Sequence, residues 1–334
     1  MPLLTLIIPV YNRSALLAAA LDSVCRQTFQ DYEVIIVDDG STDDTADVLA
    51  REAAKDRWQG RLRLLHQANA GQGAARNLAI DHAAGEYCTF LDSDDLLFPW
   101  SFEVVARTIH EHGRPPLIFG KEFTFETLEE YAAVPTEALK AVSWPDLYTF
   151  VKTNRLGGPG AVTAKTRVLR EAGKFLVDRV VGEDIDLLYR LGTLSPMVHI
   201  AAPATTGYRI HAAQFTVDTE KWYLGASSLI RRCKAGIFPG GPQRYAEIRN
   251  LITKEVVFFT FMCLFWGRQG TLRGLKLYLR TINWQIRAGR FDALFRFPVC
   301  LILSLAGLWP LNAKLRERQA AAKQHNARSL ALAS

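Results

Sequence analysis

The chain has 334 residues, of which 49% are hydrophobic, so it is long enough to bury one large core or two smaller ones. Its five cysteines are scattered and include no C-x-x-C pair, which argues against a cysteine zinc site and a disulfide-bonded scaffold. The net charge of +6 is uneven, because residues 1–219 carry −8 and residues 220–334 carry +14. The two regions are predicted to be separate domains with different partners.

Short apolar runs alternate with helix-like segments at the start of the chain. The first run contains Pro9 and is followed by Asn12 and Arg13, so it predicts a strand and not a signal peptide. Ser41, with Asp44 three residues later, resembles a capping box that would open the second helix. The alternation predicts right-handed βαβ units and a Rossmann-like, mostly parallel sheet flanked by helices. The predicted strands are 5–10, 34–37, 62–66 and the run up to residue 92, and the predicted helices are 14–27, 43–54 and 71–84.

The pattern is looser after a predicted helix at residues 99–112. Residues 126–157 show no clear period and are interpreted as a variable insertion that faces an acceptor. A further helix is predicted from Gly182 to Leu194, with carboxylates in its first turn, where they complement the helix dipole. Short strands are predicted at 117–119, 122–125, 161–164, 196–201 and 206–211.

Three aspartates, Asp92, Asp94 and Asp95, follow the fourth predicted strand. Because an unpaired carboxylate buried away from water is costly, we expect them at the carboxyl edge of the sheet, where ligands bind in open α/β folds. Asp92 and Asp94 flank one residue, a spacing that lets two carboxylates converge on Mg²⁺ or Mn²⁺. A helix cap or a surface turn is the alternative interpretation of this pair.

Five motifs follow one another along the first two thirds of the chain. They are Ile8-Pro-Val-Tyr-Asn12, Val37-Asp-Asp-Gly-Ser-Thr-Asp43, Asn69-Ala-Gly-Gln-Gly-Ala-Ala-Arg-Asn77, Asp92-Ser-Asp-Asp95 and Gly182-Glu-Asp184. In this order and spacing they resemble the family-2 inverting glycosyltransferases of the GT-A fold, over roughly residues 3–211. The resemblance implies that residues 1–219 form a catalytic domain that binds a nucleotide-sugar and an acceptor. It does not extend to the C-terminal third.

The resemblance also implies a nucleotide-binding set. Pro9 and Tyr11 would form the wall against which the base lies, while Asp39, next to Asp38, would accept a hydrogen bond from the imide N–H of uracil. Arg76, in the helix after a glycine-rich turn, would contact the nucleotide or its phosphates. The ordinary alternatives are a core tyrosine, aspartates that cap the next helix and an arginine on a solvated helix face.

The Asp92-Ser-Asp motif corresponds to the DxD motif of the family. Asp92 and Ser93 would contact the nucleotide near its ribose, and Asp92 and Asp94 would bind a divalent metal ion, Mn²⁺ or Mg²⁺. His211, in Tyr208-Arg-Ile-His211, resembles a further metal or pyrophosphate ligand, although a lone histidine is usually structural. Such an ion would neutralise the charge that gathers on the diphosphate leaving group.

Asp184 is the predicted catalytic base, by its position as the second carboxylate of Gly182-Glu-Asp184. Inversion in a single displacement needs a carboxylate that takes the proton from the acceptor hydroxyl, and such assistance contributes about 10²–10⁴-fold. Glu183 would orient it. Stabilisation of the following helix by both carboxylates is the alternative.

The C-terminal region, residues 220–334, is predicted to be helical, basic and membrane-associated. Residues 255–266 and 297–311 are apolar, but each is shorter than the roughly 20 residues that span a bilayer. Arginines and aromatic residues lie between and within them, as is typical of helices in the membrane interface. The alternatives are a helical subdomain that packs on the catalytic domain and a dimer interface.

The predicted function is inverting, metal-dependent transfer of a sugar from a UDP-sugar to a hydroxyl of a glycan or lipid-linked acceptor. By resemblance, the setting is bacterial surface polysaccharide synthesis, at the cytoplasmic face of the inner membrane. No G-x-G-x-x-G follows the first strand, which argues against a dinucleotide-binding domain. A sugar-1-phosphate nucleotidyltransferase and a non-enzymatic nucleotide-binding or signalling module are the competing hypotheses, and a nucleic-acid partner is not expected because the apolar runs are long.

Overall fold

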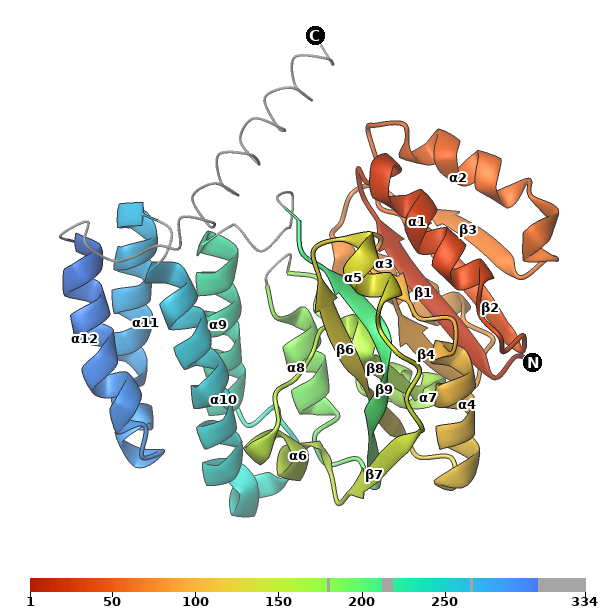
Figure 1. The fold of residues 1–334 in the computed structure, drawn as a ribbon. Coiled ribbons are helices and arrows are strands. Elements are labelled where there is room, and N and C mark those ends of the chain that lie inside the picture. The colour runs from red at the N-terminus through yellow and green to blue at the C-terminus, as the bar shows by residue number, and fades with distance from the viewer. Residues whose placement is uncertain (179–180, 212–218, 265–266, 306–334) are drawn as a thin grey trace, which may run out of the picture. The chain divides into compact units, whose positions relative to one another are not determined.

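The computed structural model describes residues 1–334 except 179–180, 212–218, 265–266 and 306–334 (Figure 1). The chain forms two compact units. The first contains Met1–Arg179 and Glu183–Arg209, and the second contains Val180–Gly182 and the chain from Ile210 onward.

A nine-stranded mixed sheet, counted over the described residues, organises the first unit. Its strands follow the order β3-β2-β1-β4-β8-β6-β9-β5, and β7 pairs with β9. Strands β3, β2, β1 and β4 run parallel, so their carboxyl ends lie at one edge. The strands are β1 Leu4–Val10, β2 Tyr32–Asp38, β3 Leu62–His66, β4 Tyr87–Phe90, β5 Leu96–Leu97, β6 Leu117–Phe125, β7 Lys140–Trp144, β8 Val162–Lys165 and β9 Met197–Arg209.

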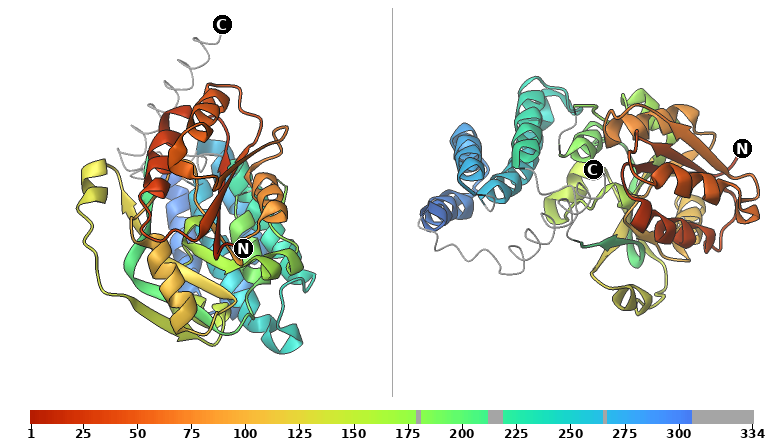
Figure 2. Two further views of the ribbon diagram at one scale, coloured as in Figure 1. Left: turned by 90° about the vertical axis from the view of Figure 1, so that its right-hand side faces the viewer. Right: turned by 90° about the horizontal axis from the view of Figure 1, so that it is seen from above.

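The parallel part of the sheet is buried on both faces, which explains its continuous apolar strands. Leu6 and Ile8 of β1 join a core cluster with Leu17 and Leu21 of α1. Ile7 points to the opposite face because side chains alternate along a strand, and there β1 contacts α3. Helices therefore cover both faces of the sheet (Figure 2).

The helices of the first unit connect these strands. They are α1 Ser14–Cys25, α2 Thr45–Ala53, α3 Gln72–His82, α4 Ser101–Glu111, α5 Leu128–Ala132, α6 Leu147–Thr153, α7 Thr166–Glu171 and α8 Glu183–Arg190, with short 3₁₀ turns at Asp56–Trp58 and Pro159–Ala161.

The predicted α/β class is confirmed, and the structure adds detail beyond β4. Strand β8 runs antiparallel to both β4 and β6, so the sheet is mixed in this half. Two pairs of predicted short strands are single strands, β6 and β9. Residues 126–157, which show no hydrophobic period, contain α5, β7 and α6. Neither α5 nor β7 has a buried residue, so neither needs a periodic apolar face.

The second unit is helical, as predicted. Trp222 of α9 packs edge-on against Phe259 of α10, with ring centroids 4.7 Å apart. Tyr278 of α11 stacks on Phe297 of α12 at 4.4 Å. Among the described residues, no helix combines the length and the hydropathy that a bilayer span requires. The helices are α9 Thr219–Lys234, α10 Gly241–Leu264, α11 Gly267–Arg287 and α12 Phe291–Leu305.

Candidate active site

Two buried aspartates, Asp38 and Asp39, stand at the carboxyl end of β2. The Asp39 carboxylate accepts hydrogen bonds from Gln67 Nε2 at 2.7 Å and from the backbone N–H groups of Ala70 at 2.7 Å and Gly71 at 2.8 Å. Asp39 therefore fixes the loop that leads into α3. A carboxylate has about four acceptor positions, so the predicted bond from a uracil imide is compatible with this arrangement and stays a prediction.

Hydrogen bonds fix Ser41, in the loop after β2, to Asp38 and to the loop after β1. Asp38 Oδ1 accepts from the Ser41 N–H at 2.9 Å, and its Oδ2 lies 3.2 Å from His66 Nδ1. Ser41 Oγ accepts from the Asn12 N–H at 3.0 Å. The predicted capping box of Ser41 and Asp44 is wrong, because Ser41 is used by the first loop and α2 begins later without a side-chain N-cap bond.

The other predicted nucleotide-binding residues lie at the same edge. Pro9 is buried within β1, and Tyr11, just beyond that strand, is 44% exposed and therefore not a core residue. Ser93 is buried after β4. Their predicted contacts with a base or a ribose stay predictions.

Arg76 joins the carboxylates of two separate motifs. Gly71, with a φ of 92°, makes the turn into α3, and Arg76 is fully buried one turn further along that helix. Its Nη2 donates to Asp92 Oδ1 at 2.6 Å and its Nη1 donates to Glu183 Oε1 at 2.8 Å. Gln72 Nε2 donates to the same Glu183 oxygen at 2.7 Å. The sequence predicted a nucleotide contact for Arg76, whereas here both Nη atoms bind protein carboxylates.

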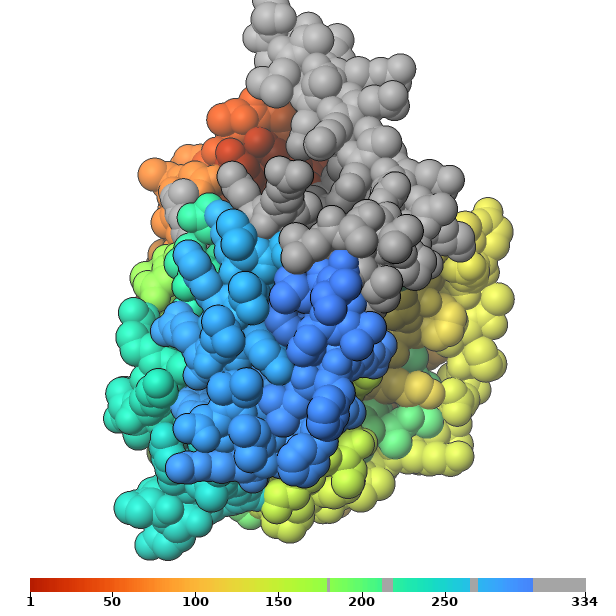
Figure 3. Space-filling view, turned by 90° about the vertical axis from the view of Figure 1, so that its left-hand side faces the viewer, coloured from red at the N-terminus to blue at the C-terminus, as the bar shows by residue number. Residues whose placement is uncertain are grey.

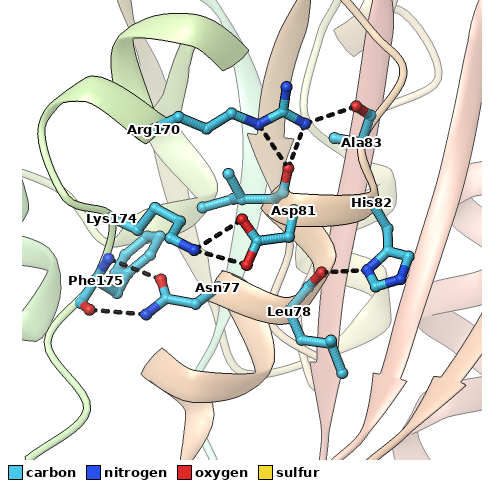
Figure 4. A network of polar contacts seen from close by, with 9 residues as sticks. Asn77, Leu78, Asp81, His82, Ala83, Arg170, Lys174 and Phe175 are labelled. Carbon is cyan, nitrogen blue, oxygen red and sulfur yellow. Dashed lines mark hydrogen bonds and ion pairs between the residues drawn. The ribbon is translucent and has the colours of Figure 1, made fainter.

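Helix α3 is fastened to the segment that follows α7 (Figure 4). Asn77 exchanges two hydrogen bonds with the backbone of Phe175, at 2.9 and 2.8 Å. Lys174 Nζ pairs with Asp81, and Arg170 donates to the Ala83 carbonyl at 2.9 Å. These contacts place the Phe175 ring 5.2 Å from the Arg76 guanidinium, so the buried cation also has an aromatic neighbour.

Asp184, the predicted base, is half-buried in the first turn of α8, next to buried Glu183. Burial raises the pKa of Asp184, and the charge of Asp92 raises it further, although a hydrogen bond from the Ile185 N–H and the charge of Arg76 oppose this. Burial, with Asp184 beside it, raises the pKa of Glu183 to about 7. A carboxylate with a raised pKa is a stronger base, which suits the predicted role.

The aspartates after β4 form an acidic group. Asp94 Oδ2 lies 3.6 Å from Arg13 Nε. Asp95 is buried and accepts from the Arg209 N–H at 2.9 Å. Burial raises the pKa of Asp95 well above its usual range, and the charges of Asp92 and Asp94 add to the effect. Asp92 and Asp94 are partly exposed, so the alternative of a helix cap or a surface turn for this pair stays open.

Glu122 was not recognised from the sequence. It lies on β6, and its two carboxylate oxygens accept from the Gly158 N–H at 3.0 and 3.1 Å. Burial raises the pKa of Glu122 to about 7, with a further contribution from the charge of Asp92. A charged residue between two apolar strand segments was the available signal.

A divalent cation fits the donor chemistry of Asp92 and Asp94, because carboxylate oxygens are the ligands that Mg²⁺ and Mn²⁺ prefer. Asp95 follows directly, so three carboxyl groups lie within four residues of one another. Among the described residues, no three histidine, cysteine or carboxylate side chains are already gathered around one point as a metal site. His211 belongs to the second unit, and its role as a ligand stays a prediction.

The parallel sheet with acidic loops at its carboxyl edge defines a GT-A-like α/β fold, and solved structures agree. A crystal structure of S. aureus TarS superposes with a TM-score of 0.62 at 20% identity, covering 96% of this chain and 91% of that one. The mannosyltransferase PcManGT from Pyrobaculum calidifontis, in complex with GDP-Man and Mn²⁺, gives 0.53 at 18% identity, covering 98% and 87%. At such identities the likeness shows the fold.

Residues 5–164, which lie in the first unit, match the family model described as glycosyl transferase family 2. The predicted resemblance is thereby confirmed. An uncharacterized glycosyltransferase of Rickettsia felis is 44% identical over 108 residues, covering 32% of this chain and 17% of the relative. The uncharacterized glycosyltransferase YibD of Escherichia coli is 35% identical over 139 residues, covering 41% and 40%. The chain therefore matches less than half of the length of these relatives.

Proposed function

We propose that this protein transfers a sugar from a nucleotide-sugar, with UDP favoured, to a hydroxyl of a glycan or lipid-linked acceptor, inverting the anomeric carbon. The observation that carries the proposal is the Arg76 bridge, which joins Asp92 of the DxD motif to Glu183 beside the base candidate. The family assignment of residues 5–164 supports the reaction class. A TarS structure in complex with UDP-GlcNAc supports a nucleotide-sugar donor.

The donor would lie along the carboxyl ends of β1, β2 and β4. Tyr11 has an exposed ring against which a base could stack. The Asp39 carboxylate, fixed by backbone N–H groups, would accept a hydrogen bond from the base. Asp92 and Asp94 would hold a divalent cation, which when bound would neutralise charge on the diphosphate. Ser93, next to this pair, would contact the ribose.

Asp184 would take the proton from the acceptor hydroxyl as its oxygen attacks the anomeric carbon. The bond from that carbon to the diphosphate breaks on the opposite side, which gives a β product from an α-linked donor. Glu183 has its oxygen bound by Arg76 and Gln72, so it orients its neighbour and is less available to act as a base itself.

The second unit supports the proposal for the acceptor and the cellular setting. Its basic, apolar helices suit a peripheral position on the cytoplasmic face of a bacterial inner membrane, where a lipid-linked acceptor of surface polysaccharide synthesis would be found.

The experiment is nucleoside diphosphate release from a panel of nucleotide-sugars with Mn²⁺ or Mg²⁺, with the anomer of the product read by NMR. We expect release from one donor, loss of at least about 10²-fold in Asp184→Asn with acceptor present, and loss in Asp94→Asn. The matched control is Asp47→Asn, an exposed aspartate of α2, which should keep full activity. Pyrophosphate release from UTP and a sugar 1-phosphate would instead identify a nucleotidyltransferase, and nucleotide binding without turnover would identify the non-enzymatic alternative.

A further inference from the structure

Helix α12 exposes an apolar row. The row has the spacing i, i+4, i+8 and i+11, which on a helix of about 100° per residue keeps it within an arc of roughly 80°. The opposite side of the helix is anchored, because Phe297 and Cys300 are buried in the core of the second unit. The row consists of Phe291, Phe295, Val299 and Ile302, which are 55%, 76%, 56% and 65% exposed.

Helix α11 exposes a second apolar row bordered by positive charge. Leu272, Leu279 and Ile286 recur every seven residues and are 60%, 58% and 49% exposed. A basic row lies next to this apolar row around the helix. The two rows therefore run side by side along the length of α11. The basic row consists of Lys276, Arg280 and Arg287, all of which are exposed.

The two apolar rows lie on neighbouring helices. Helices α11 and α12 lie side by side on one face of the second unit (Figure 3). They are joined by the Tyr278–Phe297 ring stack and by a hydrogen bond from Tyr278 Oη to the Leu294 carbonyl at 3.0 Å. We call the two apolar rows and the basic row of α11 the docking face.

The charge around the docking face identifies the kind of partner. Residues 267–305 contain seven arginines or lysines and a single carboxylate, Asp292, which lies 3.5 Å from Arg290. Two copies meeting through this face would bring like charges together, which disfavours a dimer. Lipid phosphates beside an acyl layer complement both the basic row and the apolar rows.

We propose that the docking face binds the surface of an anionic phospholipid bilayer. The apolar rows would enter the boundary between head groups and acyl chains, and the basic row would contact lipid phosphates. This inference rests on the proposed function in one respect, namely that docking would bring the protein to a lipid-linked acceptor. What it adds is the surface that contacts the membrane.

The test is co-flotation of the full chain with vesicles of phosphatidylglycerol and phosphatidylcholine, compared with phosphatidylcholine alone. We expect binding to the anionic vesicles that weakens as salt is added. The double variant Phe295→Gln/Ile302→Gln should lower the partition coefficient at least about tenfold. Lys276→Gln/Arg287→Gln should lower it by roughly tenfold or more on anionic vesicles and little on neutral ones. The matched control is Leu224→Gln on α9, 44% exposed and outside the docking face, which should bind as the wild type does.

Two results would overturn the proposal. One is absence of wild-type binding to anionic vesicles, including the case in which the face instead forms a dimer that Phe295→Gln/Ile302→Gln dissociates. The other is unchanged binding by that variant when its circular dichroism and melting temperature match the wild type. Donor turnover separates the two proposals: vesicle binding without nucleoside diphosphate release contradicts only the proposed function, and release without vesicle binding contradicts only the docking face.

Discussion

Arg76 carries a fully buried positive charge that two carboxylates balance. Asp92 follows β4 and keeps 30% of its side chain exposed, whereas the Glu183 side chain is only 5% exposed. Removing the guanidinium would therefore affect Glu183 most, because water cannot replace its partner.

We expect Arg76→Met to lower the free energy of unfolding by about 3–5 kcal/mol at neutral pH. The loss should be smaller at low pH, where Glu183 can become neutral. The free energy of unfolding of Arg76→Lys should lie between those of the wild type and Arg76→Met, because one ammonium group cannot bridge both carboxylates. Urea unfolding at two pH values measures this, with Arg107→Met, from an exposed pair with Glu111, as the control that should change by less than about 1 kcal/mol. Equal effects at Arg76 and Arg107 would contradict the interpretation.

Glu122 should make stability depend on pH. Its pKa rises from 4.5 to about 7 on folding, so between these values the folded protein holds a proton that the unfolded chain releases. The contribution of Glu122 is therefore present below pH 4.5 and is lost as the pH rises toward 7, by at most about 3 kcal/mol. Glu122→Gln should flatten this part of the profile in chemical unfolding from pH 5 to pH 8. A variant with the wild-type slope would show that Glu122 is not the group that titrates.

At the level of elements, α3 is held by contacts of unequal burial (Figure 4). The Asn77 side chain makes two hydrogen bonds to the backbone of Phe175, a buried residue. The ion pair of Lys174 with Asp81 is exposed on the aspartate side, at 51%. Exposed ion pairs stabilise little, whereas buried polar groups that lose their partners are costly.

Asn77→Leu is expected to destabilise the protein by about 2–4 kcal/mol, because it leaves the N–H and the carbonyl of Phe175 without their partner. Lys174→Gln, at the neighbouring contact, should cost less than about 1 kcal/mol. Thermal unfolding of both variants measures the difference. A larger destabilisation by Lys174→Gln than by Asn77→Leu would mean that the ion pair, and not the Asn77 amide, holds α3 in place.

The elements that the sequence predicted best are those whose surroundings are uniform. Strands β1 and β2 are buried on both faces, so their apolar runs are unbroken and their positions were predicted closely. Strand β9 was predicted as two strands because Pro203 interrupts its pattern, and the register with β6 shifts in this region. The antiparallel direction of β8 depends on pairing with β4 and β6, which no local pattern encodes.

The site was predictable where a motif carries it. The motifs gave Asp39, Asp92 and Asp184 as candidates, and the structure places Asp39 after β2 and Asp92 after β4, the two strands that flank β1. The shared partner of Asp92 and Glu183 was not predictable, because Arg76 meets Glu183 only through packing between segments distant in sequence. The Glu122 contact to a backbone N–H belongs to no motif.

At the scale of the whole molecule, both units bury thiols. Of the five cysteines, all in the described part of the chain, four are buried and Cys25 is partly exposed. Burial raises the pKa of Cys88 and of Cys263 to about 12 and that of Cys233 to about 11. Few of these groups can be thiolates in the native protein, and the thiolate is the reactive form.

A disulfide reagent at pH 8 should therefore label Cys25 at most within minutes in the native protein, and all five thiols after denaturation. Mass spectrometry of labelled peptides during a denaturant titration should show Cys88 and Cys263 reacting as their own units unfold. Rapid native labelling of Cys88 would mean that the sheet opens far more readily than its burial indicates.

The bridge made by Arg76 has a consequence for anyone who wishes to redesign this protein. If Asp92 binds the donor and Asp184 the acceptor, as proposed, a mutation near Asp92 would also affect the residues around Glu183, because Asp92 and Glu183 share the Arg76 guanidinium. Mutations near Asp92 and mutations near Glu183 should then show strong epistasis when they are combined. A library should therefore vary both regions together and keep Arg76 unchanged.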